Sequence, residues 1–91
     1  MEFKDAVQQI LDRGAKVLGT GIALKDIDDE FYAISETEIS YCPRKDIIEE
    51  RISKDGEFIG TLEVNSAYSN HFSPFIRGVL ALMKLEILEL I

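Results

Sequence analysis

The chain has 91 residues, 46% of them hydrophobic and 30% charged, and a formal net charge of -7. This length predicts one domain over residues 1-91, and the composition is that of an ordinary globular protein. The acidic balance excludes nucleic acid and an anionic membrane surface as expected partners, since both require clustered Lys and Arg.

The use of cysteine and the two chain ends bear on the compartment. Cys42 is the single cysteine, so no internal disulfide can form, and this usage suits a reducing compartment. Residues 1-5 lack the basic and then apolar pattern of a secretory signal. Charged residues interrupt the apolar run that begins at Phe75, so it does not approach the roughly 20 residues that cross a bilayer. We therefore expect a cytoplasmic protein without a membrane span.

The first predicted element is an amphipathic helix over residues 3-16. From Phe3 to Leu11, apolar residues recur at the i, i+4, i+7 and i+8 spacing of one helical face, and polar residues occupy the other face. Because glycine weakens a helix, we expect this one to end between Gly14 and Lys16.

Two strands are predicted next, joined by a turn. Val17–Leu24 is rich in residues that suit a strand, and the Asp28-Asp29 pair makes the turn after it. Phe31–Tyr41 reads as the second strand. Its acidic residues sit badly on a buried face, so we expect the strand to break near Ser35 and to resume at Ile39.

Acidic residues gather in the turn between these strands and in the second strand. They are Asp26, Asp28, Asp29, Glu30, Glu36 and Glu38. A solvated turn and strand edge is the favoured interpretation, because the spacing lacks the glycine and the terminal bidentate glutamate of a calcium loop. Zinc needs about four nitrogen or sulfur ligands, and Cys42 and His71 are alone. We expect no metal site and no cofactor.

A hairpin follows in the second half of the chain. Residues 45-51 suit either a short helix or an edge strand, because Ile47 and Ile48 fit both. The Asp55-Gly56 dipeptide predicts a tight turn with glycine at positive φ. The strand Phe58–Val64 comes after it and alternates in side-chain direction. We expect Phe58, Gly60, Leu62 and Val64 on one face, and Ile59, Thr61 and Glu63 on the other.

The last predicted element is a helix from Pro74 to the chain end, with Ser73 as its N-cap. Its apolar residues cover more than one face. One stripe holds Ile76, Val79, Leu80, Met83, Ile87 and Leu90, and a second set holds Leu82, Leu85, Leu88 and Ile91. A surface helix normally keeps about half of its circumference polar. This helix is therefore either a central core helix or one whose second side docks another copy of the chain.

The hairpin and the last helix together resemble the end of GAF domains, which are small sensory and ligand-binding modules. The likeness lies in the Asp-Gly turn, the Ile-Gly-x-Leu strand, the serine-containing loop and a phenylalanine before the helix. The residues are Asp55, Gly56, Ile59, Gly60, Leu62, Val64, Ser66, Phe72 and the helix from Pro74. Within that family, this tail is most similar to the one in free methionine-(R)-sulfoxide reductases. The chain is shorter than a usual GAF domain, so the resemblance implies a trimmed version.

The resemblance implies an α+β fold of the GAF/profilin-like kind, in which an antiparallel sheet carries N- and C-terminal helices packed on one face. It also implies a homodimer through the terminal helices. We expect a non-enzymatic small cytoplasmic module that binds a small ligand or a partner protein in signalling or regulation. Two alternatives stay open: a minimal free methionine sulfoxide reductase-like enzyme using Cys42, and a roadblock-like interaction protein without a pocket.

GAF-like folds hold their ligand between the sheet and the connections that cross its open face. The resemblance thereby gives the expected ligand-binding residues, which are Tyr41, Cys42, Arg44, Glu63, Tyr68 and Phe72. Arg44 is expected to favour the thiolate of Cys42. The reductases of the family use additional cysteines, and Asn65 stands where they carry an aspartate, so we expect no catalytic residue in this chain.

Overall fold

The computed structural model describes residues 2-36, 41, 46-69 and 71-91. Within these ranges the chain forms two α-helices, four β-strands and one short 3-10 helix. In chain order they are α1 (Phe3–Leu18), β1 (Ile22–Lys25), β2 (Phe31–Ile34), β3 (Ile47–Lys54), β4 (Glu57–Asn65), the 3-10 helix η1 (Ser66–Tyr68) and α2 (Ser73–Glu89). The expected α+β class is therefore confirmed.

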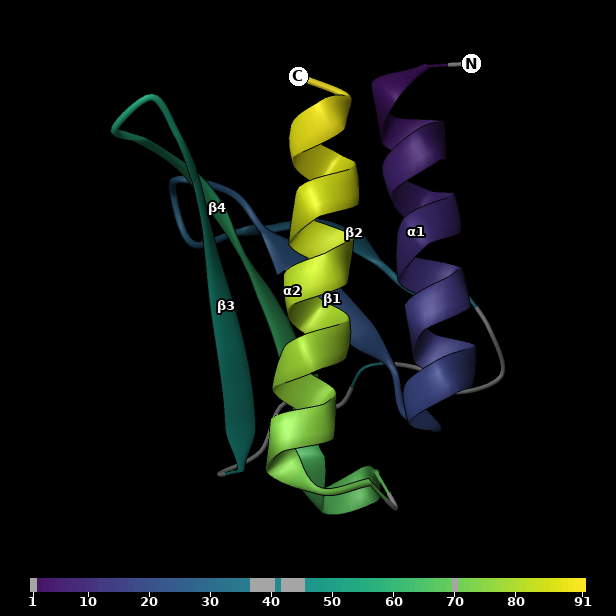
Figure 1. The fold of residues 1–91 in the computed structure, drawn as a ribbon. Helices are drawn as coiled ribbons and strands as arrows, with labels where there is room; N and C mark the ends of the chain where they lie inside the picture. Colours follow the sequence, from purple (N-terminus) through teal and green to yellow (C-terminus); the bar gives the residue numbers. More distant parts are fainter. Residues whose placement is uncertain (1, 37–40, 42–45, 70) are drawn as a thin grey trace.

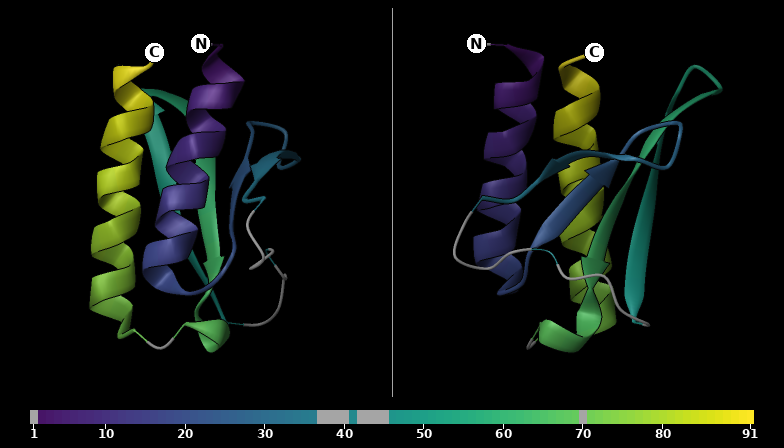
Figure 2. Two further views of the ribbon diagram at one scale, coloured as in Figure 1. Left: turned by 90° about the vertical axis from the view of Figure 1, so that its right-hand side faces the viewer. Right: turned by 180° about the vertical axis from the view of Figure 1, so that it is seen from behind.

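The strands form one antiparallel sheet in the order β2-β1-β4-β3. Both helices lie side by side on the same face of this sheet (Figures 1 and 2), which is the arrangement that the sequence predicts. The two chain ends lie close to each other, at the end of the molecule where the β3–β4 hairpin has its tip. One face of the sheet is thus covered by helices, and we call the opposite face the outer face.

The hydrophobic core fills the space between the sheet and the two helices. Its buried members are Val7, Ile10, Leu11, Ala15, Leu18, Ile22, Leu24, Ala33, Ile48, Ile52, Leu62, Val64, Ile76, Leu80, Met83 and Ile87. The helices approach closely at Gly14, where an added Cβ would lie 2.5 Å from Met83 Sδ and 2.9 Å from Ile22 Cδ1. An added methyl group here would make the ends of the Met83 and Ile22 side chains shift, so Gly14 lies where α1 packs closely on the core.

β4 is an inner strand, hydrogen-bonded to β1 on one side and to β3 on the other. The turn before it is the predicted one: Asp55 has a φ of 54° and Gly56 a φ of 81°, the left-handed values of a primed hairpin turn. Leu62 and Val64 are fully buried and face the helices. From Gly60 to Val64 the side chains alternate as the sequence predicts.

The predicted alternation is wrong before Gly60. The ladder to β3 shifts register after the Ile52–Gly60 pair and leaves Ile59 as an extra residue, which is a β-bulge. Ile59 therefore packs against the core. Phe58 instead pairs with the Arg51 guanidinium, which lies 4.3 Å from the ring centroid. A bulge re-aims the side chains beside it, and strict alternation in the sequence gives no sign of it.

α1 extends further than predicted, because Gly14 does not end it. The helix continues through Val17 and Leu18, which were expected to begin a strand. It stops at Gly19, whose φ of 72° and whose N–H bonded to the carbonyl of Ala15 form a left-handed C-cap. The glycine that ends the helix is thus the one with positive φ, and the earlier glycine serves packing.

β2 and β3 settle two further expectations. β2 ends at Ile34, next to the break predicted near Ser35, and the expected resumption at Ile39 lies outside the described residues. Of the alternatives for residues 45-51, the edge strand is correct and the helix is wrong, since β3 begins at Ile47 and pairs only with β4. Ile48 and Ile52 supply core contacts on the helix side of the sheet.

α2 begins at Ser73 with Pro74 in its first turn. Phe72 is the N-cap residue, so the expectation that Ser73 caps the helix is wrong, and no side chain makes a cap hydrogen bond. The structure does not divide the apolar residues of this helix along the two predicted sets, because Leu90 of the first stripe is exposed and Leu88 of the second set packs against the core. Ile76, Leu80, Met83 and Ile87 are buried, whereas Leu82, Leu85, Leu90 and Ile91 are exposed. The core therefore uses only one side of this helix.

The close approach of β1 and β4 gives a first test. A Cβ at Gly60 would collide with the carbonyl oxygen of Lys25. We expect Gly60→Ala to lower the free energy of unfolding by about 1–3 kcal/mol, because the two strands must separate. Urea unfolding followed by circular dichroism measures this change.

Gly78→Ala is the matched control for that measurement. Gly78 is exposed on α2, and an added Cβ there meets nothing within 4 Å. The better helix propensity of alanine should raise the free energy of unfolding by about 1 kcal/mol. An unchanged stability of Gly60→Ala beside this control would contradict the close strand approach.

Candidate functional site on the outer face of the sheet

The outer face is defined by the side chains of β4 that point away from the helices. Because Leu62 and Val64 face the core, Glu63 between them points to the outer face. Its cross-strand partner on β1 is Ala23. Both residues are buried, Ala23 at 0% and Glu63 at 5% exposed, although neither belongs to the core under the helices. The outer face is therefore covered at this point.

Glu63 is held by a polar network. The Tyr41 hydroxyl donates a hydrogen bond to Glu63 Oε2 at 3.0 Å, and the ammonium of Lys25 lies 3.4 Å from the same oxygen. The ring of Phe31 completes the cluster: its centroid is 5.2 Å from Lys25 Nζ and 5.7 Å from the Tyr41 ring, at an interplanar angle of 63°. We call these four residues the outer-face network.

The outer-face network explains how a carboxylate can be buried on this sheet. A buried charge is tolerated when it has an opposite charge and hydrogen-bond donors around it. Glu63 has both, and Lys25 keeps 21% of its side chain exposed, so water still reaches the cation. The ion pair of Lys25 with Asp29, at 3.7 Å, is exposed and adds little. The network holds the Tyr41 side chain against the sheet.

The structure brings two of the expected ligand-binding residues together, Tyr41 and Glu63, through their hydrogen bond. Phe72 lies elsewhere: it is the N-cap of α2 and is 87% exposed. The backbone of Tyr68 belongs to η1. Cys42 and Arg44 fall outside the described residues, and so does any thiol chemistry expected of them.

Sequence reasoning missed Lys25 and Phe31 as members of this network. Lys25 directly follows the first predicted strand and Phe31 begins the second, with no indication of a common partner. Their meeting depends on the pairing of β1 with β4 and with β2, which sets Lys25 beside Thr61 on one side and Phe31 on the other. An antiparallel pairing between strands some 40 residues apart leaves no local signal in the sequence.

The other chemistry-bearing residues are engaged in local structure. Asp26 Oδ1 accepts hydrogen bonds from the backbone N–H of Asp28 and of Glu30, so the acidic turn is closed by its own carboxylate. His71 Nε2 lies 2.9 Å from the carbonyl of Val17, and its ring stacks on a phenylalanine. In the part of the chain that the structure describes, no group of three or more His, Cys, Asp or Glu side chains is placed to hold a metal ion.

The chain was compared with protein-family models, with curated proteins and with solved structures, and it matches none of them. Among the described residues, no helix has the length and apolar character to cross a bilayer.

The outer-face network yields a second prediction. Removing the hydroxyl in Tyr41→Phe should lower the free energy of unfolding by about 1–2 kcal/mol, since a hydrogen bond to a charged group is lost in a buried place. Glu63→Gln keeps the size of the side chain and should cost a similar amount. In the double variant the two losses should not add, because Tyr41→Phe removes the donor of the bond and Glu63→Gln removes the charge that strengthens the same bond.

Tyr32→Phe is the control for this cycle, because Tyr32 lies on the helix side of the sheet and outside the network. Its effect on stability should stay below about 0.5 kcal/mol. Urea unfolding of the four variants and the wild type measures all terms. Strict additivity of Tyr41→Phe and Glu63→Gln would show that the hydrogen bond between Tyr41 and Glu63 does not contribute to stability.

Proposed function

We propose that this chain is a non-enzymatic, homodimeric module of GAF/profilin-like architecture that binds a small ligand or a partner protein in signalling or regulation. The observation that carries the proposal is the row of exposed apolar side chains along α2. A cytoplasmic location belongs to the same proposal and rests on the single cysteine.

The exposed row lies on the side of α2 opposite the core. Phe75, Gly78, Leu82 and Leu85 follow one another at i, i+3, i+7 and i+10, which is the spacing of a single helical face. Phe75 is 39% exposed, Leu82 65% and Leu85 57%. Single exposed hydrophobic residues are ordinary, but a continuous apolar row on one helix marks a contact surface. We call these four residues the α2 row.

A second copy of the chain fits the α2 row better than an unrelated partner does. In a two-fold pair the two α2 helices run antiparallel, so that one self-complementary patch serves both protomers. Charge supports this arrangement: Arg77 lies in the N-terminal half of α2 and Glu89 in its last turn, whereas Glu86 is paired with Arg13 of its own chain. Antiparallel packing brings unlike charges and unlike helix ends together.

Size also favours self-association. A domain of about 90 residues buries a smaller fraction of its surface than larger domains do, and its stability is correspondingly modest. Burying Leu82 and Leu85 against a partner would remove apolar surface from water that the fold leaves exposed.

Architecture supports the likeness to GAF and profilin-like modules. The hairpin that carries the resemblance lies in the sheet with β4 as an inner strand, and both terminal helices cover that strand. The outer-face network occupies the region where such modules hold ligands. In this chain Glu63 is already satisfied by Tyr41 and Lys25, so the geometry favours dimerisation more directly than it favours a ligand at that face.

The dimer proposal is tested by a charge in the middle of the α2 row. Leu82→Lys should yield a folded monomer, because Leu82 contributes to no buried contact and two lysines would meet at the two-fold axis. Sedimentation velocity gives the oligomeric state, and circular dichroism gives the fold. A wild type that sediments as a monomer at high concentration contradicts the proposal.

Two further variants complete this experiment. Ile27→Lys changes a residue of equal exposure, 64%, in the turn after β1, and should leave the dimer intact. Leu88→Lys should instead unfold the chain, since Leu88 packs against the core. If Ile27→Lys dissociated the dimer as well, added charge and not the α2 row would be the cause.

A further inference from the structure

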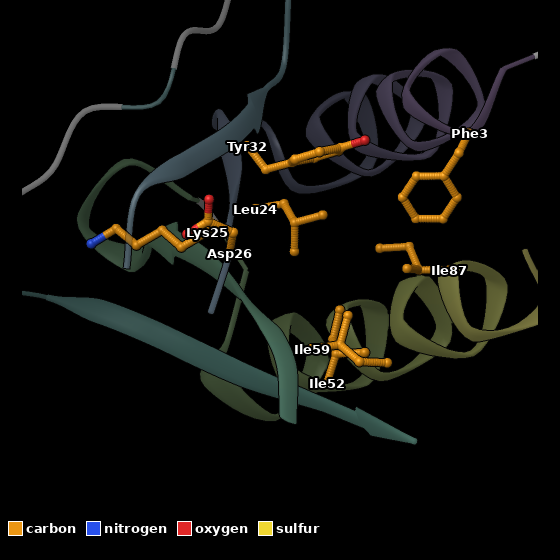
Figure 3. A pocket seen from close by; sticks show the side chains of 8 residues that line it. All are labelled: Phe3, Leu24, Lys25, Asp26, Tyr32, Ile52, Ile59 and Ile87. Atoms are coloured by element: carbon orange, nitrogen blue, oxygen red, sulfur yellow. The ribbon is translucent and has the colours of Figure 1, made fainter. Parts of the chain in front are cut away.

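A second candidate binding site lies on the side of the sheet opposite the outer-face network. A pocket of about 190 Å³ lies on the helix side of the sheet, near the chain ends, with walls from both helices and all four strands (Figure 3). It is lined by Phe3, Leu24, Lys25, Asp26, Tyr32, Ile52, Ile59 and Ile87. Tight protein interiors hold few voids larger than a water molecule, so an opening of this size is notable in so small a domain.

The floor and the mouth of the pocket can be told apart by exposure. Leu24, Ile52 and Ile87 are 6%, 0% and 1% exposed and form its floor. Phe3, in the first turn of α1, is 39% exposed and lies at the mouth. Its ring faces that of Tyr32, with a centroid separation of 6.1 Å and an interplanar angle of 59°. The pocket thus has an apolar floor, and an aromatic pair lies at its mouth.

We infer that this pocket binds an uncharged, largely apolar small molecule of about the size of one substituted six-membered ring. The volume supports this size, because an apolar cavity of about 150 Å³ in another protein takes up benzene. This inference rests on the ligand-binding part of the proposed function and gives it a ligand class and a place, on the opposite side of the sheet from Glu63 and Tyr41.

The two charged lining residues do not offer their charges to a ligand. The ammonium of Lys25 is engaged with Glu63, and in Figure 3 the side chain points away from the apolar side chains of the pocket. The carboxylate of Asp26 accepts two backbone hydrogen bonds inside its own turn. A charged ligand would therefore be desolvated without a partner, which is costly. Water is no better an occupant, since the apolar floor gives it no hydrogen bonds.

The bulge in β4 shapes one wall of the pocket. Because Ile59 is the extra residue of the bulge, it turns to the helix side and lies next to Ile52 in the pocket. Gly60 beside it lets β1 approach closely, which brings Leu24 into the same wall. A regular strand would point Ile59 to the outer face and would leave the pocket without this wall.

The test uses toluene as an apolar probe and benzoate as its charged counterpart. Methyl NMR spectra of the wild-type chain are recorded during titration with each compound. Toluene should shift the methyl signals of Leu24, Ile52, Ile59 and Ile87 saturably and raise the melting temperature. Benzoate should bind at least tenfold more weakly. A wild type whose pocket methyls do not respond to toluene, or respond equally to benzoate, overturns the inference.

Variants separate pocket binding from general stickiness. Ile59→Phe fills the pocket and should weaken toluene binding at least tenfold, whereas Ile27→Phe, the same change at an exposed turn position, should leave it unchanged. Phe3→Ala alters only the partly exposed mouth, so the fold is retained, and it should weaken binding at least threefold. If Ile59→Phe folds and shows toluene shifts of wild-type size, the inference is overturned. If Ile59→Phe does not fold, toluene shifts of wild-type size in Phe3→Ala overturn it.

The same samples keep this inference apart from the dimer. Leu82→Lys lies on the far side of α2 from the pocket and should bind toluene within twofold of the wild type. If Leu82→Lys binds toluene and the wild type is a monomer, only the dimer proposal is contradicted. A wild-type dimer without toluene binding would sink only the pocket.

Discussion

The burial of one face of β4 beneath the two terminal helices is the contact on which the rest of this structure depends. Leu62 and Val64 are fully buried there, and their neighbours on β1 and β3 join the same core. Because side chains alternate along a strand, this burial forces Glu63 to the other face. The burial of Leu62 and Val64 thus creates a hydrophobic core on one face and a buried carboxylate, which must be neutralised, on the other.

The two sides of the sheet solve different physical problems. On the outer face, the problem is charge, and Lys25 with Tyr41 compensates Glu63. On the helix side, the problem is volume: the bulge at Ile59 and the divergence of strands and helices near the chain ends leave space that the core does not fill. α2 adds a third surface, because its apolar residues exceed what one core can cover. The proposed apolar ligand is assigned to the second of these features and the proposed dimer to the third.

The hairpin and both helices could be predicted because their signals are local. Asp55-Gly56 carries the turn in two residues, and the apolar spacing of α1 and α2 repeats over several turns. Predictions failed where a distant contact overrode a local rule. The pattern at Gly14 predicts a helix end, but the helix continues past it, closely packed against Met83, and stops at Gly19. Ile59 reads as an outward residue, and a register shift against β3 turns it inward.

The amino-acid sequence by itself determined the class of the domain, the order of its main elements, the primed turn and the excess of apolar surface on the last helix. These features depend on the spacing and composition of residues within short stretches of the chain, so they can be predicted without knowing its distant contacts. Tertiary structure alone decided which residues meet. Lys25 reaches Glu63, and Phe3 reaches Tyr32, only through strand pairing and helix packing between segments far apart in the chain. The candidate site and the apolar pocket both arise from such pairings, and a sequence read in local windows holds no record of them.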